Sequence, residues 1–182
     1  MKIVQTNIPE VKLIIPDVYG DQRGFFFESW RDSWSDKIGI DRSFVQDNHS
    51  CSHLGTLRGL HYQVERPQGK LVRVTKGKVF DVAVDLRASS GTFGLWVGVE
   101  LSEENKQIMW IPPGFAHGFY VMSDHAEFVY KCTDYYYKSG ERTLKWNDPA
   151  VGVKWPIIEG ASILLSEKDE CGLNLEECEL YN

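Results

Sequence analysis

Three polar side chains stand in an otherwise apolar stretch, LRGLHYQ, at residues 57–63. They are Arg58, His61 and Gln63, and a strand that only filled a core would not normally carry all three. A neutral imidazole has a pKa of about 6.5 and accepts a proton near neutral pH, so His61 is a candidate base. In a regular strand Arg58 and His61 point to opposite faces. Gly59 between them predicts a β-bulge that turns both side chains into one cavity.

A second histidine, His117, follows a Pro-x-Gly turn in IPPGFAHGF. Pro112, Gly114 and His117 match the second half of the metal-binding pattern of cupin-type β-barrels. The first half of that pattern is a His-x-His pair, and HYQ places Gln63 where the second imidazole belongs. An amide is a poor ligand for a transition metal, so the sequence predicts no metal site.

Cationic groups surround His61 in the predicted strands. Arg58 precedes it, Lys70 and Arg73 follow in the next strand, and His117 lies on a separate one. A buried histidine without a metal is more often a hydrogen-bonded core residue. Several cations together, however, favour a pocket that binds an anion.

The elements that must position these residues are mostly strands. Short β-like runs, separated by Gly, Pro, Asp and Asn, extend from VKLIIPDVYG to about Tyr137 at the spacing of a sandwich or barrel. The clearest pattern, KLVRVTKGKVFDVAVDLR, predicts two strands joined as a hairpin at residues 76–78. Period two in the second strand puts four apolar residues on one face: Phe80, Val82, Val84 and Leu86. GLWVGVELS and EFVYKCTDYYY predict further strands, and SWRDSWSDKIG and LSEKDECGLNLEE predict short helices. We expect the segment after Trp155 to pack across the barrel mouth.

The length of 182 residues suits one core, so we expect a single domain over residues 1–182. The formal net charge of −6, without a long Lys/Arg run, argues against a nucleic-acid partner. The four cysteines are widely spaced and form no CxxC pair, which argues against a disulfide scaffold or structural zinc. The N-terminus lacks the apolar core of a signal peptide, and no run approaches the ~18 apolar residues that span a bilayer. We therefore expect a cytoplasmic protein without a membrane anchor.

Nine motifs, in order from about Arg23 to Asp169, resemble the dTDP-4-dehydrorhamnose 3,5-epimerase family. They are DQRGFFFE, FVQDNHS, LRGLHYQ, PQGKLVRV, FDVAVDLR, IPPGFAHGF, YKCTDYY, WNDP and LSEKD. The resemblance implies an all-β fold: a double-stranded β-helix, or cupin-like jelly roll, with a few short peripheral helices. It also implies a homodimer that converts dTDP-4-dehydro-6-deoxy-D-glucose to dTDP-4-dehydro-L-rhamnose without a cofactor. The family's commonest use is rhamnose synthesis for cell-surface polysaccharides.

The resemblance assigns four catalytic roles. His61 removes the protons beside the C4 ketone, and Asp169 orients the imidazole and stabilises it when charged. Tyr130 is the acid on the opposite face of the sugar, because a phenol with a pKa of about 10 stays protonated at neutral pH. Lys70 stabilises the negative charge of the enolate oxygen.

The resemblance also implies a set of substrate-binding residues, of which Arg23 and Glu28 reach the site of the neighbouring subunit. The family's stacking tyrosine aligns with Tyr136, but its usual proline two residues later is Lys138 here. Which of the three tyrosines at 135–137 stacks on the base therefore stays open. The complete set is Arg23, Glu28, Gln46, Asp47, Asn48, Arg58, Lys70, His117, Tyr136, Glu141 and Lys168.

Two alternatives to the 3,5-epimerase remain from the sequence. One is a relative that inverts a single carbon, or that acts on another nucleotide sugar. The other is a non-catalytic cupin that binds a sugar nucleotide. Both enzyme hypotheses use His61 and Tyr130, so the residues hardly separate them.

Overall fold

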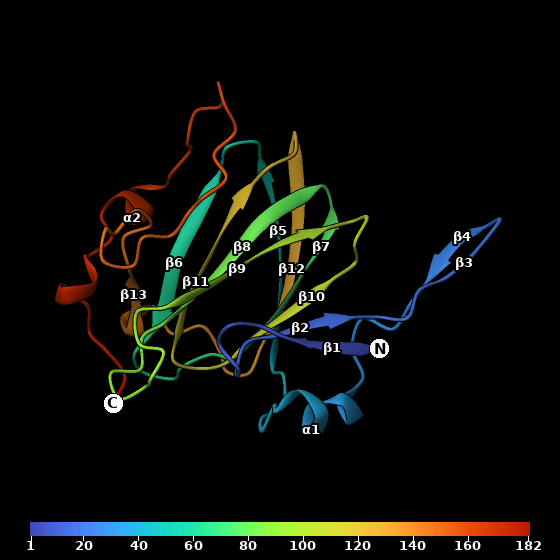
Figure 1. The fold of residues 1–182 in the computed structure, drawn as a ribbon, viewed down its shortest axis with the longest axis horizontal. Helices are drawn as coiled ribbons and strands as arrows, with labels where there is room; N and C mark the ends of the chain where they lie inside the picture. Colours follow the sequence, from blue (N-terminus) through green and yellow to red (C-terminus); the bar gives the residue numbers. More distant parts are fainter.

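The computed structural model describes residues 1–182, which form two antiparallel sheets facing each other as a barrel (Figure 1). One sheet has six strands in the order β1 (Lys2–Gln5), β2 (Lys12–Ile15), β10 (Ile108–Ile111), β7 (Lys70–Lys76), β12 (His125–Cys132) and β5 (Gln46–His53). The other has five, in the order β13 (Glu141–Thr143), β6 (Leu57–Gln63), β11 (Phe115–Val121), β8 (Lys78–Asp85) and β9 (Trp96–Ser102). The all-β, cupin-like jelly roll predicted from the sequence is confirmed.

Period two in the strands builds a core on each side of the five-stranded sheet. Val79 and Ala83 of β8 point into the barrel, where they pack against Val72 of β7 and Phe128 of β12. The alternate residues of β8 from Phe80 onward, and Leu86 directly after the strand, share the opposite face as predicted. Both faces of this strand are therefore buried.

The C-terminal segment covers the outer face of the five-stranded sheet. Trp155, Leu175, Leu180 and Tyr181 pack there against the outer side chains of β6, β8 and β11. The prediction that the segment after Trp155 packs across the barrel mouth is therefore wrong for most of its length. The apolar outer face of the sheet needs cover from water, and this segment supplies it.

The predicted hairpin at Lys76-Gly77-Lys78 is also wrong, although both strands form where expected. β7 pairs with β10 and β12, and β8 pairs with β11 and β9, so the chain crosses from one sheet to the other at Gly77. Gly77 has a φ of +73°, and a Cβ there would lie 2.1 Å from the carbonyl oxygen of His125. A tight turn does form at Gly77, but it joins strands of different sheets instead of a paired hairpin.

The predicted bulge at Gly59 is confirmed. His61 pairs with His117 and Arg58 pairs with Phe119, so three residue steps of β6 lie opposite two of β11. Gly59 has a φ of +119°, and a Cβ there would lie 2.6 Å from Cα of Gly118. This close approach lets Arg58 and His61 line the same cavity.

We expect Gly59→Ala to lower the free energy of unfolding by more than the ~1–3 kcal/mol that an unfavourable φ costs a non-glycine residue. The methyl group would also clash with the backbone of β11. The matched control is Gly160→Ala, where φ is +79° and no heavy atom lies within 4 Å of the added Cβ. Denaturant unfolding measures both variants, and equal losses would contradict the close packing at the bulge.

The helices are short and peripheral. η1 (Asp32–Trp34) and α1 (Ser35–Ile38) form within SWRDSWSDKIG and pack Trp34 and Ile38 on the outer face of the six-stranded sheet. α2 (Glu167–Glu170) and η3 (Leu175–Glu177) form within LSEKDECGLNLEE, and η2 (Lys138–Gly140) precedes β13. None of the helices is long and apolar enough to cross a membrane.

A two-stranded ribbon, β3 (Tyr19–Asp21) and β4 (Gly24–Phe26), projects from the barrel (Figure 1). Its aromatic side chains Tyr19, Phe25 and Phe26 are more than 60% exposed. Such a cluster of exposed aromatic rings is typical of a surface that another molecule covers.

Candidate active site

A cavity of about 240 Å³ opens between the two sheets. Most of the predicted site residues line it, from strands of both sheets, from the loop after β12 and from α2: Arg58, His61, Lys70, His117, Tyr130, Tyr136, Glu141 and Lys168. The chain thus gathers residues that are more than a hundred positions apart into one concave site.

His61 and Asp169 form a hydrogen-bonded pair at one side of the cavity. The distance between Nε2 of His61 and Oδ1 of Asp169 is 2.6 Å, and the carboxyl group is buried. Asp169 also accepts hydrogen bonds from the backbone N–H of Gly59 and from the hydroxyl of Ser166, at 3.0 and 2.6 Å. Ser166 caps α2 and Asp169 closes the reciprocal capping box, so the helix start holds the carboxylate in place.

The electrostatics of this pair keep the imidazole neutral and the carboxylate charged. Burial lowers the pKa of His61 below 6.5, against the opposing effect of the hydrogen bond with Asp169. Burial by itself raises the pKa of Asp169, but the hydrogen bonds from His61, Ser166 and Gly59 outweigh it and hold that pKa far below its usual range. A neutral imidazole beside a fixed carboxylate is prepared to accept a proton.

For a reaction in which His61 acts as the base, we expect the rate to fall at acid pH, with a midpoint below pH 6.5. A base acts only when unprotonated, and the lowered pKa of His61 moves its protonation to lower pH. Asp169 stays ionised through this range, so the limb reports the imidazole alone. The pH profile of kcat/KM measures it, and a midpoint clearly above 6.5 would show that the carboxylate governs the imidazole more strongly than burial does.

Tyr130 enters the same cavity from the opposite sheet. It lies on β12, whereas His61 lies on β6, so the two groups reach the cavity from facing walls. Burial raises the pKa of Tyr130 to about 12, with Cys132 adding to the rise and Arg58 opposing it. The phenol is therefore protonated at neutral pH and able to donate.

Lys70 lies on the wall of Tyr130, and a second histidine–carboxylate pair lies on the wall of His61. Nε2 of His117 is 3.0 Å from both carboxylate oxygens of Asp81, and both residues are buried. Burial lowers the pKa of Lys70. Asp81 and other acidic groups nearby oppose this shift. The sequence did not identify Asp81 as a site residue, although the alternation of β8 places it on the face of the strand opposite to that of Val82.

The rim of the cavity holds Tyr136, Glu141 and Lys168. The Tyr136 hydroxyl donates to Oε2 of Glu141 at 3.0 Å, and Nζ of Lys168 lies 2.9 Å from Oε1 of the same carboxylate. The Tyr136 ring is half-exposed and lines the cavity, whereas Tyr135 lies under Arg66 and does not line it. Among the three adjacent tyrosines, Tyr136 is therefore the one whose ring borders the site.

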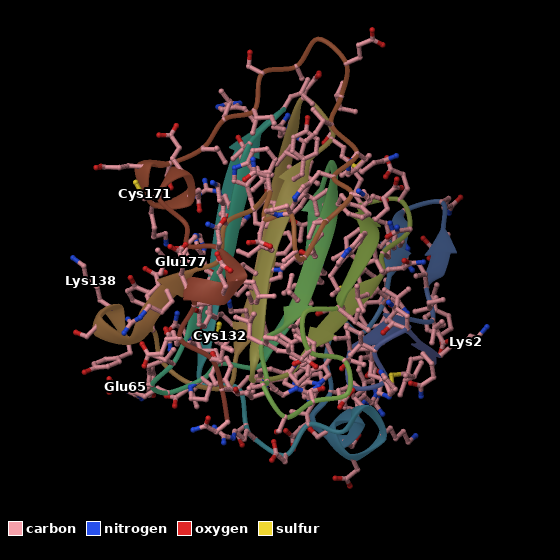
Figure 2. The ribbon with its side chains drawn as sticks, turned by 60° about the vertical axis from the view of Figure 1, so that its left-hand side comes forward. Lys2, Glu65, Cys132, Lys138, Cys171 and Glu177 are labelled. Atoms are coloured by element: carbon pink, nitrogen blue, oxygen red, sulfur yellow. The ribbon has the colours of Figure 1, made fainter.

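Gln46 and Asn48 approach the site less directly. Oε1 of Gln46 accepts from the backbone N–H of Tyr136 at 2.9 Å, and Nδ2 of Asn48 donates to Sγ of Cys132 at 3.6 Å. Cys132 is buried inside the barrel, whereas Cys171 at the end of α2 is exposed (Figure 2). All four cysteines are unpaired thiols.

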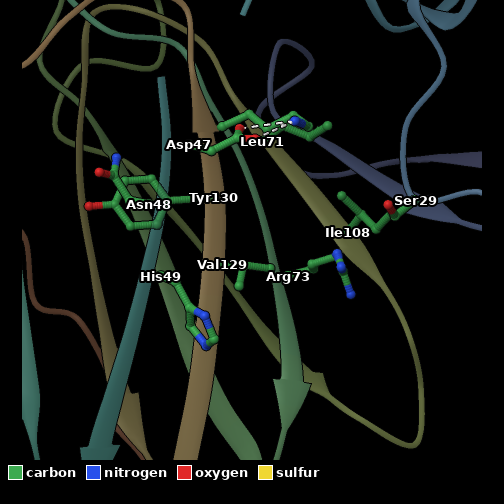
Figure 3. Close-up of a pocket in the computed structure, with 10 residues that line it drawn as sticks. Ser29, Asp47, Asn48, His49, Leu71, Arg73, Ile108, Val129 and Tyr130 are labelled. Atoms are coloured by element: carbon green, nitrogen blue, oxygen red, sulfur yellow. Dashed lines mark hydrogen bonds and ion pairs between the residues drawn. The ribbon is translucent and has the colours of Figure 1, made fainter. Parts of the chain in front are cut away.

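Gln46 and Asn48 do not line the cavity, and four further predicted residues lie away from it. Asp47 and Arg73 lie on the outer face of the six-stranded sheet, where they line a separate pocket with His49 (Figure 3), and Asp47 pairs with Lys131 at 2.9 Å. The predicted membership of Arg73 in the cationic pocket is wrong, because it is three positions from Lys70 and so points to the other face. Arg23 and Glu28 lie on or after the projecting ribbon, paired with Asp21 and Arg31.

Gln63 and Gln68 are further cavity residues whose contacts the sequence did not reveal. Both amide groups bind the backbone of the loop that carries Tyr136. No group of three or more His, Cys, Asp or Glu side chains is arranged to hold a metal ion.

A jelly-roll barrel whose cavity sets a His–Asp pair against a protonated tyrosine defines a cupin-like protein equipped for proton transfer. Comparison with known proteins identifies the particular family. The sequence profile of the dTDP-4-dehydrorhamnose 3,5-epimerases matches residues 5–177, and the chain belongs to that family.

Its relatives are similar over the whole chain. The dTDP-4-dehydrorhamnose 3,5-epimerase of Pseudomonas aeruginosa is 54% identical over 182 residues, which cover 100% of this chain and 99% of that protein. The enzyme of Neisseria gonorrhoeae is 55% identical over 179 residues, or 98% of this chain, and the chain spans only 54% of that relative's length.

Solved structures agree with the barrel. The dTDP-6-deoxy-D-glucose-3,5-epimerase of Legionella pneumophila, in complex with dTDP-4-keto-L-rhamnose, superposes with a TM-score of 0.96 at 51% identity, covering 99% of this chain and 97% of that chain. A 3'-monoepimerase of Streptomyces bikiniensis, in complex with dTDP-quinovose, gives a TM-score of 0.87 at 32% identity and covers 94% of this chain and 87% of that one. The barrel is thus common to enzymes that invert one carbon and to enzymes that invert two.

Proposed function

We propose that this protein inverts carbons 3 and 5 of dTDP-4-dehydro-6-deoxy-D-glucose, giving dTDP-4-dehydro-L-rhamnose. The observation that carries the proposal is the placement of His61, backed by Asp169, and of Tyr130 on facing walls of one cavity. Both carbons flank the C4 ketone, so a proton removed from either one leaves an enolate. Inversion needs a base on one side of the ring and an acid on the other.

In each inversion His61 takes the proton from carbon, and the electron pair moves onto the ketone oxygen. Lys70 stabilises that developing charge, because an ammonium group fixed beside the oxygen need not reorient as water must. Tyr130 then delivers its proton to the opposite face of the same carbon. The imidazolium and phenolate that remain return to their starting states by proton exchange with water, and the second carbon follows in the same way.

The rest of the molecule supplies groups that suit the nucleotide. Arg58 and Lys168 border the cavity and offer donors to a diphosphate, the anion for which a cationic pocket was predicted. Tyr136 at the rim offers a ring face to the thymine. His117 lines the same cavity, where its pairing with Asp81 holds the imidazole in place for contact with the substrate.

Incubation with dTDP-4-dehydro-6-deoxy-D-glucose in deuterated water tests the proposal. Deuterium at both carbons 3 and 5 of the product is the expected result, because each new C–H bond takes a solvent-derived proton. Deuterium at one carbon only would replace the proposal by a single-carbon epimerase. Binding of the sugar nucleotide with no uptake would leave a non-catalytic binding protein.

The proposal includes a homodimer in which the β3–β4 ribbon of one subunit serves the site of the other. Arg23 lies on this ribbon with its side chain 86% exposed, outside the cavity of its own chain. The exposed Tyr19, Phe25 and Phe26 beside it would be covered by the partner. Glu28 follows the ribbon and is carried with it.

Mixing two inactive variants tests the shared site. Arg23→Ala and His61→Ala, each poorly active alone, are expected to recover about a quarter of wild-type activity when their subunits exchange, because half of the dimers then have one intact site. Activity assays before and after a cycle of mild denaturation and refolding of the mixture measure the recovery. Mixtures that stay inactive would place Arg23 and His61 in the same site of one chain.

Four further expectations stay predictions: the single-domain organisation, the cytoplasmic location, catalysis without a cofactor, and the use of the product for a cell-surface polysaccharide. The free thiols suit a reducing compartment.

A further inference from the structure

In LRGLHYQ, Gln63 occupies the position of a metal ligand of the cupin pattern. The nitrogen and the oxygen of its amide group both make hydrogen bonds within the protein. Gln63 is 5% exposed at the end of β6. Nε2 donates to the carbonyl oxygens of Arg66 and Tyr135 at 2.8 and 3.3 Å, and Oε1 accepts from the N–H of Tyr137 at 2.9 Å. Little hydrogen-bonding capacity remains for a ligand.

Two other glutamines bind the same loop from different places in the fold. Nε2 of Gln68 donates to the carbonyl oxygen of Asp134 at 2.8 Å. Oε1 of Gln46, from β5, accepts from the N–H of Tyr136 at 2.9 Å. Each residue from 134 to 137 therefore has one backbone group bound by a glutamine side chain.

These contacts replace the backbone hydrogen bonds that a strand or helix would provide. β12 ends at Cys132 and η2 begins at Lys138, and residues 134–136 make no backbone–backbone hydrogen bond. A segment of this kind would be mobile without side-chain partners, since each backbone group would otherwise bind water. The loop carries Tyr136, whose ring lines the cavity.

We propose that Gln63, with Gln46 and Gln68, is a positioning residue that holds the loop 134–137 so that Tyr136 faces the base of the nucleotide before it binds. This inference rests on the proposed function, because it takes the ligand to be a thymidine nucleotide. Holding the ring in advance lowers the conformational cost of binding. Gln63 acts through Tyr136 and touches neither the sugar nor the reacting carbons.

The test combines Gln63→Leu with a ligand-free measurement. Hydrogen exchange of the Tyr137 amide in the nucleotide-free protein, followed by NMR, is expected to accelerate about tenfold once its acceptor is lost. If the loop is then competent about a tenth of the time, the affinity for dTDP falls about tenfold and KM rises to match, while kcat stays within about twofold. Gln107→Leu is the control, since the Gln107 side chain makes no hydrogen bond in the structure.

A double-mutant cycle separates positioning from general damage. Tyr136→Ala in the Gln63→Leu background is expected to lower dTDP affinity little further. The second change removes a ring that the loop no longer holds in the binding position. Full additivity of the two losses, an unchanged Tyr137 amide, or a fall in kcat with unchanged dTDP affinity would each overturn the inference. A wild-type chain that binds dTDP but takes up no deuterium would overturn the proposed function alone, and one that binds no dTDP would overturn both.

Discussion

His61→Ala is expected to lower deuterium uptake at both ring carbons by about 10²–10⁴-fold, the usual contribution of a positioned base. The same imidazole serves carbons 3 and 5, so the two losses should be of similar size. Asp169 is a poor substitute base, because the hydrogen bonds from Ser166 and the backbone of Gly59 remain in this variant and still lower the pKa of its carboxyl. Proton NMR of the recovered sugar nucleotide measures both positions at once.

The control for this variant is His49→Ala. His49 lies on the exposed face of β5 and contacts Glu127 at 3.2 Å, outside the cavity. Its removal should leave uptake unchanged. Unimpaired exchange in the His61 variant would end the role proposed for the LRGLHYQ motif, and loss at one carbon only would require a second base for the other.

Tyr130→Phe is expected to separate proton loss from inversion. His61 can still remove a proton and, after exchange with solvent, return a deuteron to the same face. The recovered substrate should therefore gain deuterium with its configuration unchanged, while formation of inverted product falls about 10²–10⁴-fold for want of the acid. A raised pKa of about 12 makes Tyr130 a weak acid towards water but a fully protonated donor to the basic enolate.

Tyr62→Phe serves as the matched control for loss of a phenol hydroxyl. The Tyr62 hydroxyl is buried without a hydrogen-bond partner, and its ring packs near Tyr181 beneath the C-terminal segment. Product formation should be unaffected. If Tyr130→Phe slows deuterium uptake and inversion equally, the phenol acts before or during proton removal, and the assignment of an opposed acid fails.

Local chemistry determined several features in advance. The alternation in FDVAVDL set which side chains of β8 share a face, and the glycine between Arg58 and His61 marked the bulge. In LSEKD, Ser166 and Asp169 have the spacing of a capping box, which is a local signal for the start of α2. Each of these depends on residues within a few positions of one another, and backbone geometry dictates such short-range structure.

The partners of the strands were decided only by the tertiary structure. Both faces of β8 are buried, one in the barrel and one beneath the C-terminal segment, so hydrophobicity could not tell which face is interior or which strand lies beside it. The turn at Gly77 therefore looked like a hairpin. β5 is a polar strand, QDNHSCSH, and the sequence could not show that Asp47 would be exposed while its neighbours Gln46 and Asn48 are half-buried and bind Tyr136 and Cys132.

The contacts that make the site chemically competent are also tertiary. Asp169 meets His61 across 108 positions of sequence, Asp81 meets His117 across 36, and Gln63 meets Tyr137 across 74. The sequence supplied the types of residue and the faces they occupy. Which carboxylate lies against which imidazole was settled by the packing of two sheets and a C-terminal segment, because a hydrogen bond depends on distance in space and a residue pattern records only distance along the chain.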